Sequence, residues 1–435
     1  MNLETRGPMR IALVVHKFPP ESLGGTEVYT WALARALGAL GHEVHVFYPS
    51  PDPAAAEAPL EREGIHVWRI PGRRAHGGIV GQFWHTFRDA RIEAAFTRFL
   101  ARVQPQIVHF QHVQEVSARL MELARGVPRL LTLADYWFFC ANGQLVRPDR
   151  LPCALPKDGW HCAECAISRG NARWLGALRP LVALPFVYRN WYLRRMMSQV
   201  DLFLAPSEFL RQQYLAQGFP AERFMTFENG LDTERLEAPA DVELPLPVAR
   251  PHFGFIGSLA WQKGVHVLVE AFNLLGEDAA LTIYGPEAVF PDYVTEVKAR
   301  VRHPHVRFAG LLDRRHIGAA LRQFDCLVVP SLWYENSPLV IQEAYGVGIP
   351  VVASRLGAMT EKVRDGVTGL LFTPGDSEDL ARVLRELIDH SERLAALKAN
   401  IRPAPSIQEH TRQMVGIYRA LVDGQAVAEL IPPQA

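Results

Sequence analysis

Two carboxylates stand where they could serve one ligand. Glu335 lies in a predicted loop, and Glu343 follows eight positions later inside a predicted helix. Carboxylate oxygens accept hydrogen bonds from sugar hydroxyl groups, so the pair suits a ligand that carries sugars. The structural alternative is a solvated glutamate in the loop and a second one on the helix surface.

The helix that starts between them is a predicted anion site. Ser337 stands at the N-cap and Pro338 at the first helical position, where the missing N–H of proline costs no hydrogen bond. The first free N–H groups, near Leu339 and Val340, point toward the strand ends and favour a phosphate. The loop and helix together therefore predict a ligand that combines phosphate and sugar.

The segment Ser-Leu-Trp-Tyr-Glu-Asn-Ser-Pro-Leu-Val-Ile-Gln-Glu-Ala, which contains Glu335, Asn336 and Glu343, resembles the nucleotide-sugar signature of retaining glycosyltransferase family 4. The resemblance covers most of the chain. It implies the α/β GT-B fold, with two doubly wound Rossmann-like domains and a ligand cleft between them. It further implies that Glu335 holds hydroxyl groups of the donor sugar and that Glu343 holds the ribose.

A second match lies at residues 257–264, Gly-Ser-Leu-Ala-Trp-Gln-Lys-Gly, which is similar to the family's Gly-Arg-Leu-x-x-x-Lys-Gly. The family's Arg and Lys hold the donor diphosphate, so the resemblance makes Lys263 a phosphate ligand; alone it would be read as a surface lysine. Ser258 replaces the Arg, which removes a strong bidentate contact. The resemblance also implies backbone contacts to the nucleotide base at the strand end that carries Leu311.

In the first half of the chain, the Gly24-Gly25 pair follows a predicted strand. Such a pair without the dinucleotide fingerprint is often only a turn. The resemblance implies that its N–H groups approach the donor phosphate and the acceptor.

The family usually has His immediately before Asp135, at the end of a strand that faces the reacting sugar, whereas this chain has Ala134. A methyl group cannot bind a sugar hydroxyl. Asp135 itself, or His109 and His112 at a neighbouring strand end, could replace the imidazole, although a histidine at a strand end is commonly structural.

We therefore expect catalytic roles for Glu335, Lys263, Asp135 and His109. Donor contacts are expected from Gly24, Gly25, Ser258, Lys263, Leu311, Glu335, Asn336, Ser337, Leu339, Val340 and Glu343. The departing diphosphate would be stabilised by cations and N–H groups. Since no Asp-x-Asp pair occurs in the sequence, we expect catalysis without a metal cofactor. The donor would be a UDP- or GDP-sugar and the acceptor a glycan or a lipid-linked molecule. A nucleotide-sugar epimerase or a binding protein without transfer activity is the alternative.

Four of the five cysteines lie within 26 residues, at Cys140, Cys153, Cys162 and Cys165. Clustered thiols in a reducing compartment favour a closed tetrahedral zinc site over disulfides. An iron–sulfur cluster or unligated thiols are the alternatives. Some bacterial members of the family have a similar cysteine-bearing insertion.

The segment from Arg169 to Ser198 contains six arginines, no acidic residue and five aromatic residues. Such a composition suits peripheral contact with an anionic membrane surface. A solvated helix face that covers the insertion is the structural alternative.

The composition sets the remaining limits. A formal net charge of zero argues against a broad nucleic-acid-binding surface. The apolar run at 11–15 is too short for a signal peptide, and no stretch of about 18 uncharged apolar residues occurs. We expect a cytoplasmic protein, with peripheral contact at the inner face of the cytoplasmic membrane.

The elements that must position these residues alternate between short apolar runs and longer amphipathic segments, which predicts parallel sheets. At 435 residues the chain fits two domains of roughly 200 residues each. We expect a first domain at 1–232 with the cysteine-containing insertion at about 136–198, a linker at 233–251, a second domain at 252–406, and a terminal helix and tail at 407–435 that return to the first domain. Strands are predicted at 11–15, 44–48, 65–70, 107–111, 129–133, 201–205, 224–227, 253–256, 281–284, 306–309, 327–329 and 349–353. Helices are predicted at 26–40, 79–103, 265–275, 379–389 and 407–421.

Overall fold

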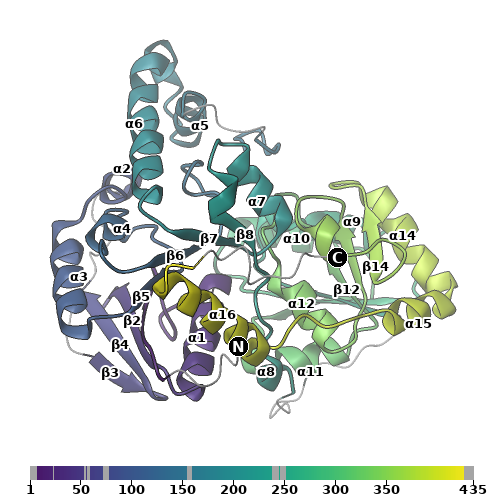
Figure 1. Cartoon of the computed structure of the whole chain (residues 1–435). Helices are drawn as coiled ribbons and strands as arrows, with labels where there is room; N and C mark the ends of the chain where they lie inside the picture. Colours follow the sequence, from purple (N-terminus) through teal and green to yellow (C-terminus); the bar gives the residue numbers. More distant parts are fainter. Residues whose placement is uncertain are drawn as a thin grey trace. The chain divides into compact units, whose positions relative to one another are not determined.

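A computed structural model describes residues 7–22, 24–52, 55, 59–71, 78–153, 159–237, 244 and 251–425 (Figure 1). The chain divides into two compact units. Unit 1 comprises Met1–Gly230 and Ile407–Ala435, and unit 2 comprises Leu231–Ser406. Each unit contains a sheet whose strands are mostly parallel, which confirms the predicted α/β class.

The sheet of unit 1 has the strand order β3-β4-β2-β1-β5-β6-β7-β8, and only the β3–β4 pair is antiparallel among its described strands. Its strands are β1 (Arg10–Val14), β2 (Glu43–Ser50), β3 (Pro59–Arg62), β4 (Ile65–Pro71), β5 (Ile107–Phe110), β6 (Arg129–Thr132), β7 (Leu202–Ala205) and β8 (Phe224–Thr226). Strands β2, β3 and β4 follow β1 in the sequence and lie on one side of it. Strand β5 then pairs with the other side of β1, and β6, β7 and β8 continue the sheet from there. Ligands of open α/β sheets bind beyond the carboxyl ends of the strands at such a reversal.

The helices of unit 1 are α1 (Gly25–Ala39), α2 (Gly78–His85), α3 (Ala90–Val103), α4 (Leu120–Leu123), α5 (Cys162–Arg169), η2 (Arg173–Leu178), α6 (Arg179–Met197), α7 (Glu208–Leu215), η3 (Ala221–Arg223) and α16 (Ile407–Val422). The terminal helix α16 packs beside α1, and both contribute to one apolar core with the central strands (Figure 1). Helices α5 and α6 lie side by side within the insertion.

The single helix predicted at 79–103 is wrong, because it is divided into α2 and α3. The side chain of Asp89 accepts hydrogen bonds from the N–H groups of Arg91 and Ile92. The carboxylate of Glu93 in turn accepts from the N–H of Asp89. This reciprocal capping starts a new helix where the apolar pattern alone suggested a continuous one.

Unit 2 contains a parallel sheet with the order β11-β10-β9-β12-β13-β14. Its strands are β9 (His252–Ile256), β10 (Ala280–Tyr284), β11 (Val306–Gly310), β12 (Cys326–Val329), β13 (Val351–Ser354) and β14 (Gly369–Phe372). Its helices are α8 (Thr233–Glu237), η4 (Trp261–Lys263), α9 (Val265–Phe272), α10 (Pro291–Ala299), η5 (Arg314–His316), α11 (Ile317–Arg322), α12 (Leu339–Gly346), α13 (Met359–Lys362), α14 (Ser377–Asp389) and α15 (Ser391–Ala399). The order reverses between β9 and β12, so the ligand-binding position of this sheet lies beyond those two strands.

The predicted linker at 233–251 begins with a packed helix. Helix α8 lies against α11, where a Cβ on Gly318 would approach the carbonyl oxygen of Leu236 to 1.9 Å. Leu236 itself is 3% exposed within the core of unit 2. Of the remaining linker residues, 238–243 and 245–250 lie outside the described part of the chain.

Candidate functional site

The predicted anion site at the start of α12 begins one residue later than expected. Pro338, with φ −68° and ψ 106°, is the N-cap, and Leu339 is the first helical residue. The expectation that Ser337 caps the helix is therefore wrong. Proline has no side-chain acceptor, so it leaves the first-turn N–H groups for another partner. The hydroxyl oxygen of Ser337 is buried and has no hydrogen-bond partner within the described residues.

Glu335 lies in the loop before α12 and is 5% exposed. Its Oε1 accepts hydrogen bonds from the Lys263 ammonium at 2.6 Å, from the Ser331 hydroxyl at 2.7 Å and from the Trp333 indole N–H at 2.8 Å. One carboxylate oxygen thus accepts hydrogen bonds from three donors. The structure brings together the two residues, Lys263 and Glu335, that the sequence assigned to the diphosphate and to the donor sugar.

A close contact between two loops explains this pairing. Gly264, directly after Lys263, has φ +70°, and a Cβ there would approach the carbonyl oxygen of Pro330 to 1.8 Å. The Leu332 N–H also donates to the Gln262 carbonyl at 2.8 Å. Only glycine permits this approach. The loop after β9 is thereby held against the loop after β12, at the reversal of strand order.

Glu343 is 6% exposed and is held by two arginines that sequence reasoning missed. Arg235 from α8 and Arg314 from η5 each donate to its Oε1 at 3.0 Å. Neither arginine lies in a recognisable motif, since one stands 108 positions from Glu343 and the other 29. Both contacts use Oε1, so Oε2 is the oxygen through which Glu343 could accept a sugar hydroxyl.

The other predicted donor contacts of unit 2 lie at strand ends or in the same loops. Ser258 follows β9, and its carbonyl accepts from the Ala260 N–H at 2.9 Å. Leu311 follows β11 and is 75% exposed. Asn336 lies between Glu335 and Ser337 in the loop before α12. Their contacts with a donor stay predictions.

In unit 1, Gly24 and Gly25 stand at the start of α1. A Cβ on Gly24 would lie 2.4 Å from Oε2 of Glu27, whose side chain is buried over the helix start. The Ser22 hydroxyl donates to Oε1 of Glu27 at 2.8 Å. The protein's own carboxylate therefore lies beside the N-terminus at which a phosphate was expected.

Asp135 pairs with His112 at the ends of neighbouring strands. Oδ2 of Asp135 lies 3.4 Å from Nε2 of His112, and the rings of His112 and His16 meet edge to face with centroids 4.8 Å apart. Burial opposes protonation of His112, but the Asp135 carboxylate, with help from Gln114 and Glu27, outweighs it and raises the pKa of His112. Burial, together with His112 and Lys17, lowers the pKa of His16 to about 2. The surroundings therefore favour the protonated form of His112 and the neutral form of His16.

The position of His109 argues against the catalytic role expected for it. His109 is fully buried within β5, where its Nδ1 lies 2.7 Å from the Tyr418 hydroxyl and its Nε2 lies 2.7 Å from the Thr132 hydroxyl. Burial lowers its pKa to about 3. It belongs to a polar network inside unit 1. We therefore move the predicted histidine role to His112, which lies just beyond the strand.

The cysteine-bearing insertion holds Asp135 in place. Gly143, with φ +70°, lets the chain pass Oδ2 of Asp135, because a Cβ there would lie only 3.0 Å away. The Trp137 N–H donates to Oδ1 at 2.8 Å, and the Tyr214 hydroxyl donates to the Asp135 carbonyl at 2.7 Å. The carboxylate is therefore oriented by the segment that follows it.

Comparison with known proteins agrees with this geometry. Residues 23–235 match the family described as Glycosyltransferase Family 4, and residues 250–390 match Glycosyl transferases group 1. The lipopolysaccharide core biosynthesis mannosyltransferase of Rhizobium meliloti is 30% identical over 77% of this chain and 99% of its own length. The chain belongs to glycosyltransferase family 4. The glycogen synthase of Mycobacterium tuberculosis is 26% identical over 88% of this chain and 86% of its own.

Solved structures agree on the fold of this family 4 chain. Sucrose-phosphate synthase from Thermosynechococcus elongatus aligns with a TM-score of 0.70 at 19% identity, over 96% of this chain and all of that one. Anabaena HepE in complex with UDP and glucose aligns with a TM-score of 0.66 at 18% identity, over 95% of this chain and all of that one. These similarities confirm the predicted GT-B architecture.

The four clustered cysteines are free thiols. Burial, followed by the neighbouring thiols, raises the pKa of Cys153 to about 11 and that of Cys162 to about 12. The Cys140 thiol donates to Asn142 Oδ1 at 2.8 Å, and the Cys165 sulfur accepts from Arg169 at 3.3 Å. Among the described residues, no three of these sulfurs lie within 4.8 Å of one another, and two of the four have separate hydrogen-bond partners.

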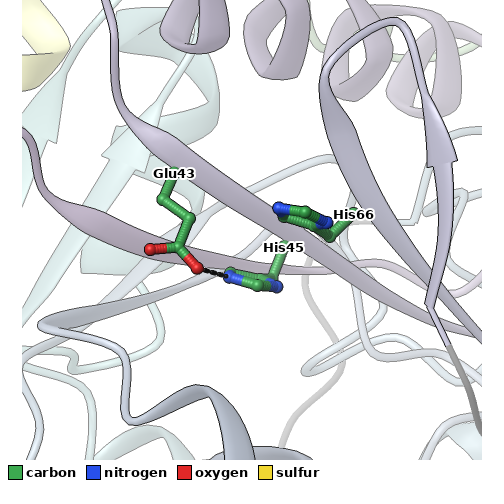
Figure 2. A group of neighbouring side chains, drawn as sticks. All are labelled: Glu43, His45 and His66. Atoms are coloured by element: carbon green, nitrogen blue, oxygen red, sulfur yellow. Dashed lines mark hydrogen bonds and ion pairs between the residues drawn. The ribbon is translucent and has the colours of Figure 1, made fainter.

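Figure 2 shows a different group of metal-ligating side chains, Glu43 and His45 on β2 with His66 on β4, whose ligand atoms lie within 4.8 Å of one another. The Trp68 indole N–H donates to Nδ1 of His45 at 3.2 Å. Burial lowers the pKa of His45, which favours the neutral ring; because Nδ1 accepts from Trp68, the proton of that neutral ring is on Nε2, which lies 2.9 Å from Glu43. A metal would need the Nε2 lone pair. The hydrogen bonds therefore fit a structural role at the amino end of β2, remote from the ligand-binding end of the sheet.

Among the helices that the structure describes, none is long and apolar enough to cross a membrane.

Proposed function

We propose that this protein is a retaining glycosyltransferase that moves a sugar from a UDP- or GDP-sugar to a glycan or lipid-linked acceptor, in envelope polysaccharide or glycoconjugate synthesis. The observation that carries the proposal is the contact of Lys263 with Glu335 at the reversal of strand order in unit 2, next to the uncapped start of α12. The relative from Rhizobium meliloti, named for lipopolysaccharide core synthesis, supports the choice of product.

The contact of Lys263 with Glu335 suggests how donor binding proceeds. When a diphosphate arrives, the Lys263 ammonium exchanges the carboxylate for a phosphate oxygen, since both are anionic acceptors. The change leaves Glu335 to accept hydroxyl groups of the donor sugar. The second carboxylate, Glu343, accepts a ribose hydroxyl through Oε2. The buried Ser337 hydroxyl, which has no described partner, offers one further contact beside the helix start.

Transfer then needs stabilisation of the leaving group. As the bond between the anomeric carbon and the phosphate oxygen breaks, negative charge grows on the diphosphate, where Lys263 and the N–H groups of Leu339 and Val340 stabilise it. The acceptor hydroxyl oxygen bonds to the anomeric carbon from the same face. Its proton passes to the departing phosphate oxygen. The lack of an Asp-x-Asp pair in the sequence supports a reaction without a metal cofactor.

The pairing of His112 with Asp135 supports a replacement for the imidazole that Ala134 lacks. The two side chains are 3.4 Å apart, and the Asp135 carboxylate raises the pKa of His112, which favours its ring as a hydrogen-bond donor. We propose that this pair binds a hydroxyl group of the substrate in unit 1.

Incubation of the whole chain with radiolabelled UDP- and GDP-sugars, with and without a lipid acceptor, tests the proposal. Labelled acceptor is the expected result. An epimerised donor would assign the chain to the alternative enzyme class. Nucleotide binding without either product would make it a binding protein.

We also propose that Cys140, Cys153, Cys162 and Cys165 hold one structural zinc. Arg189 supports this, because the residue is 1% exposed and its guanidinium pairs with no carboxylate among the described residues. Burial lowers the pKa of Arg189 to about 10, and Cys140 and Cys162 are its largest opposing influences. Zinc-bound thiolates would compensate this buried cation.

Elemental analysis of protein purified without chelator tests the zinc site. About one zinc per chain is expected in the wild type and in Cys326→Ser, because Cys326 lies alone in β12. Zinc is expected to be lost in Cys162→Ser/Cys165→Ser. A wild-type protein without metal would exclude the site, and iron in place of zinc would favour the cluster alternative.

A further inference from the structure

The surface of the insertion carries a row of exposed apolar side chains. Trp174 is 78% exposed, and the helix that follows, α6, exposes Leu181 by 63%, Leu184 by 59% and Trp191 by 54%. The same row continues through Leu178, Val187 and Tyr188. Figure 1 shows α6 extending from the sheet of unit 1, with α5 beside it. So many large apolar side chains on one segment mark an interaction surface.

The row follows one face of the helix. Positions 181, 184, 188 and 191 repeat at intervals of three and four residues, which places them on one side of an α-helix. The opposite side packs into the protein through Ala183, Leu193 and Met197, all of which are buried. Helix α6 thus has two apolar faces, and only one of them is covered by unit 1.

The charges of the segment differ from the sequence expectation that six arginines would meet the solvent. Arg189 is buried, and Arg194 is directed at the Gln217 carbonyl and the Phe219 ring. Arg179 pairs with Glu164 at 3.2 Å, whereas Arg169 donates to the Val146 carbonyl but stays exposed. The side chain of Arg173 lies outside what the structure describes. Arg195, whose guanidinium lies 6.0 Å from the Trp191 ring centroid, remains on the exposed face.

We propose that this exposed face, from Trp174 to Arg195, docks the protein on a lipid bilayer mainly by inserting apolar side chains. The aromatic residues lie toward the two ends of the row and the leucines lie between them, as side chains at a membrane interface do. A cation follows the last aromatic residue, and the segment from Arg169 to Ser198 has no acidic residue. A lipid surface is favoured over a protein partner by this distribution and by the exposed cation of Arg195 on the same face.

The inference rests on the proposed function only in one respect, because docking at a bilayer would bring the enzyme to a lipid-linked acceptor. The proposed docking is driven mainly by insertion of apolar side chains, whereas the composition of the segment suggested attraction of its arginines to anionic lipid. Six exposed arginines would make binding strongly dependent on anionic lipid and salt. On the exposed face of α6, Arg195 contributes about 1 kcal/mol near an anionic surface. Binding to a neutral bilayer is therefore expected, with about fivefold tightening on addition of anionic lipid.

Sedimentation of the full chain with phosphatidylcholine vesicles, with and without phosphatidylglycerol, tests this surface. Leu181→Gln/Leu184→Gln is expected to weaken partition by about 10- to 50-fold, because two half-inserted leucines are lost. Leu60→Gln/Leu274→Gln is the matched control, since these leucines are 49% and 50% exposed on other elements. It is expected to partition as the wild type does.

Three results would overturn the proposal. These are absence of wild-type binding to both kinds of vesicle, equal partition of the two double variants, and a change of oligomeric state in Leu181→Gln/Leu184→Gln without a change in vesicle binding. The last would assign the face to contact between copies of this chain. Donor titration of the same variants separates this test from the proposed function, because nucleotide affinity is expected to be unchanged in both. Circular dichroism confirms that each variant is folded.

Discussion

Replacement of Lys263 by methionine is the most direct test of the donor site. Methionine keeps most of the length and apolar contact of the side chain but removes the ammonium. In the structure this ammonium contacts Oε1 of Glu335 at 2.6 Å. A bound diphosphate must compete for it. The substitution is therefore expected to weaken nucleotide binding, whereas Glu335→Gln, which releases the ammonium, is expected to leave nucleotide affinity equal or to raise it.

The size of the effect follows from the exposure of the pair. A hydrogen bond to a charged group contributes about 1.5–3 kcal/mol. The Lys263 side chain is 26% exposed, and that of Glu335 is 7% exposed, so water screens the contact only in part. Exchange of one anionic partner for another reduces the net gain further. We expect Lys263→Met to cost about 1–2 kcal/mol, or about 5- to 30-fold in Kd for the nucleotide.

Calorimetric titration with UDP and with GDP measures this change without the need to know the sugar. Lys298→Met is the matched control, because Lys298 forms an exposed ion pair of 2.7 Å with Glu287 on the same unit. That variant should bind nucleotide as the wild type does. Transfer should fall in both Lys263→Met and Glu335→Gln. Nucleotide affinity should fall only in Lys263→Met.

Two outcomes would refute the reasoning. Equal nucleotide affinity in the wild type and Lys263→Met would show that the ammonium does not meet the diphosphate. Equal weakening in Lys263→Met and Lys298→Met would show that loss of any lysine has a general effect. In either case the contact between Lys263 and Glu335 would be a structural ion pair between two loops.

Three further predictions concern the carboxylates and the missing imidazole. Glu343→Ala should weaken nucleotide binding by about 1–3 kcal/mol, because the ribose loses a charged acceptor, and unchanged affinity by calorimetry would contradict that role. Asp135→Asn should lower the pKa of His112, since the carboxylate favours the imidazolium; if transfer needs the protonated ring, the alkaline limb of its pH profile should move to lower pH. An unmoved limb would remove His112 from the reaction. Ala134→His should raise transfer with little change in donor affinity, whereas an unchanged or abolished rate would mean that the pocket is built around Ala134.

The sequence by itself determined the fold class, the family and the unit 2 candidates. Short apolar runs between amphipathic segments predict parallel sheets, because each strand and helix must bury one kind of face. Lys263, Glu335 and Glu343 could be found because their motifs are local to strand–loop–helix segments. The start of α12 was misplaced by one residue for a local reason, since a proline can occupy either the N-cap or the first helical position.

Only the tertiary structure decided which side chains surround these residues. Arg235 and Arg314 reach Glu343 from distant segments, and no spacing rule predicts such a meeting. His109 and His112 have different surroundings although they are three positions apart. His109 lies within a strand under α16, whereas His112 lies beyond the strand end beside Asp135. The sequence likewise shows that the insertion contains arginines, but not which of them are buried and which face the solvent. Burial depends on what packs against each face, and that is a property of the folded chain.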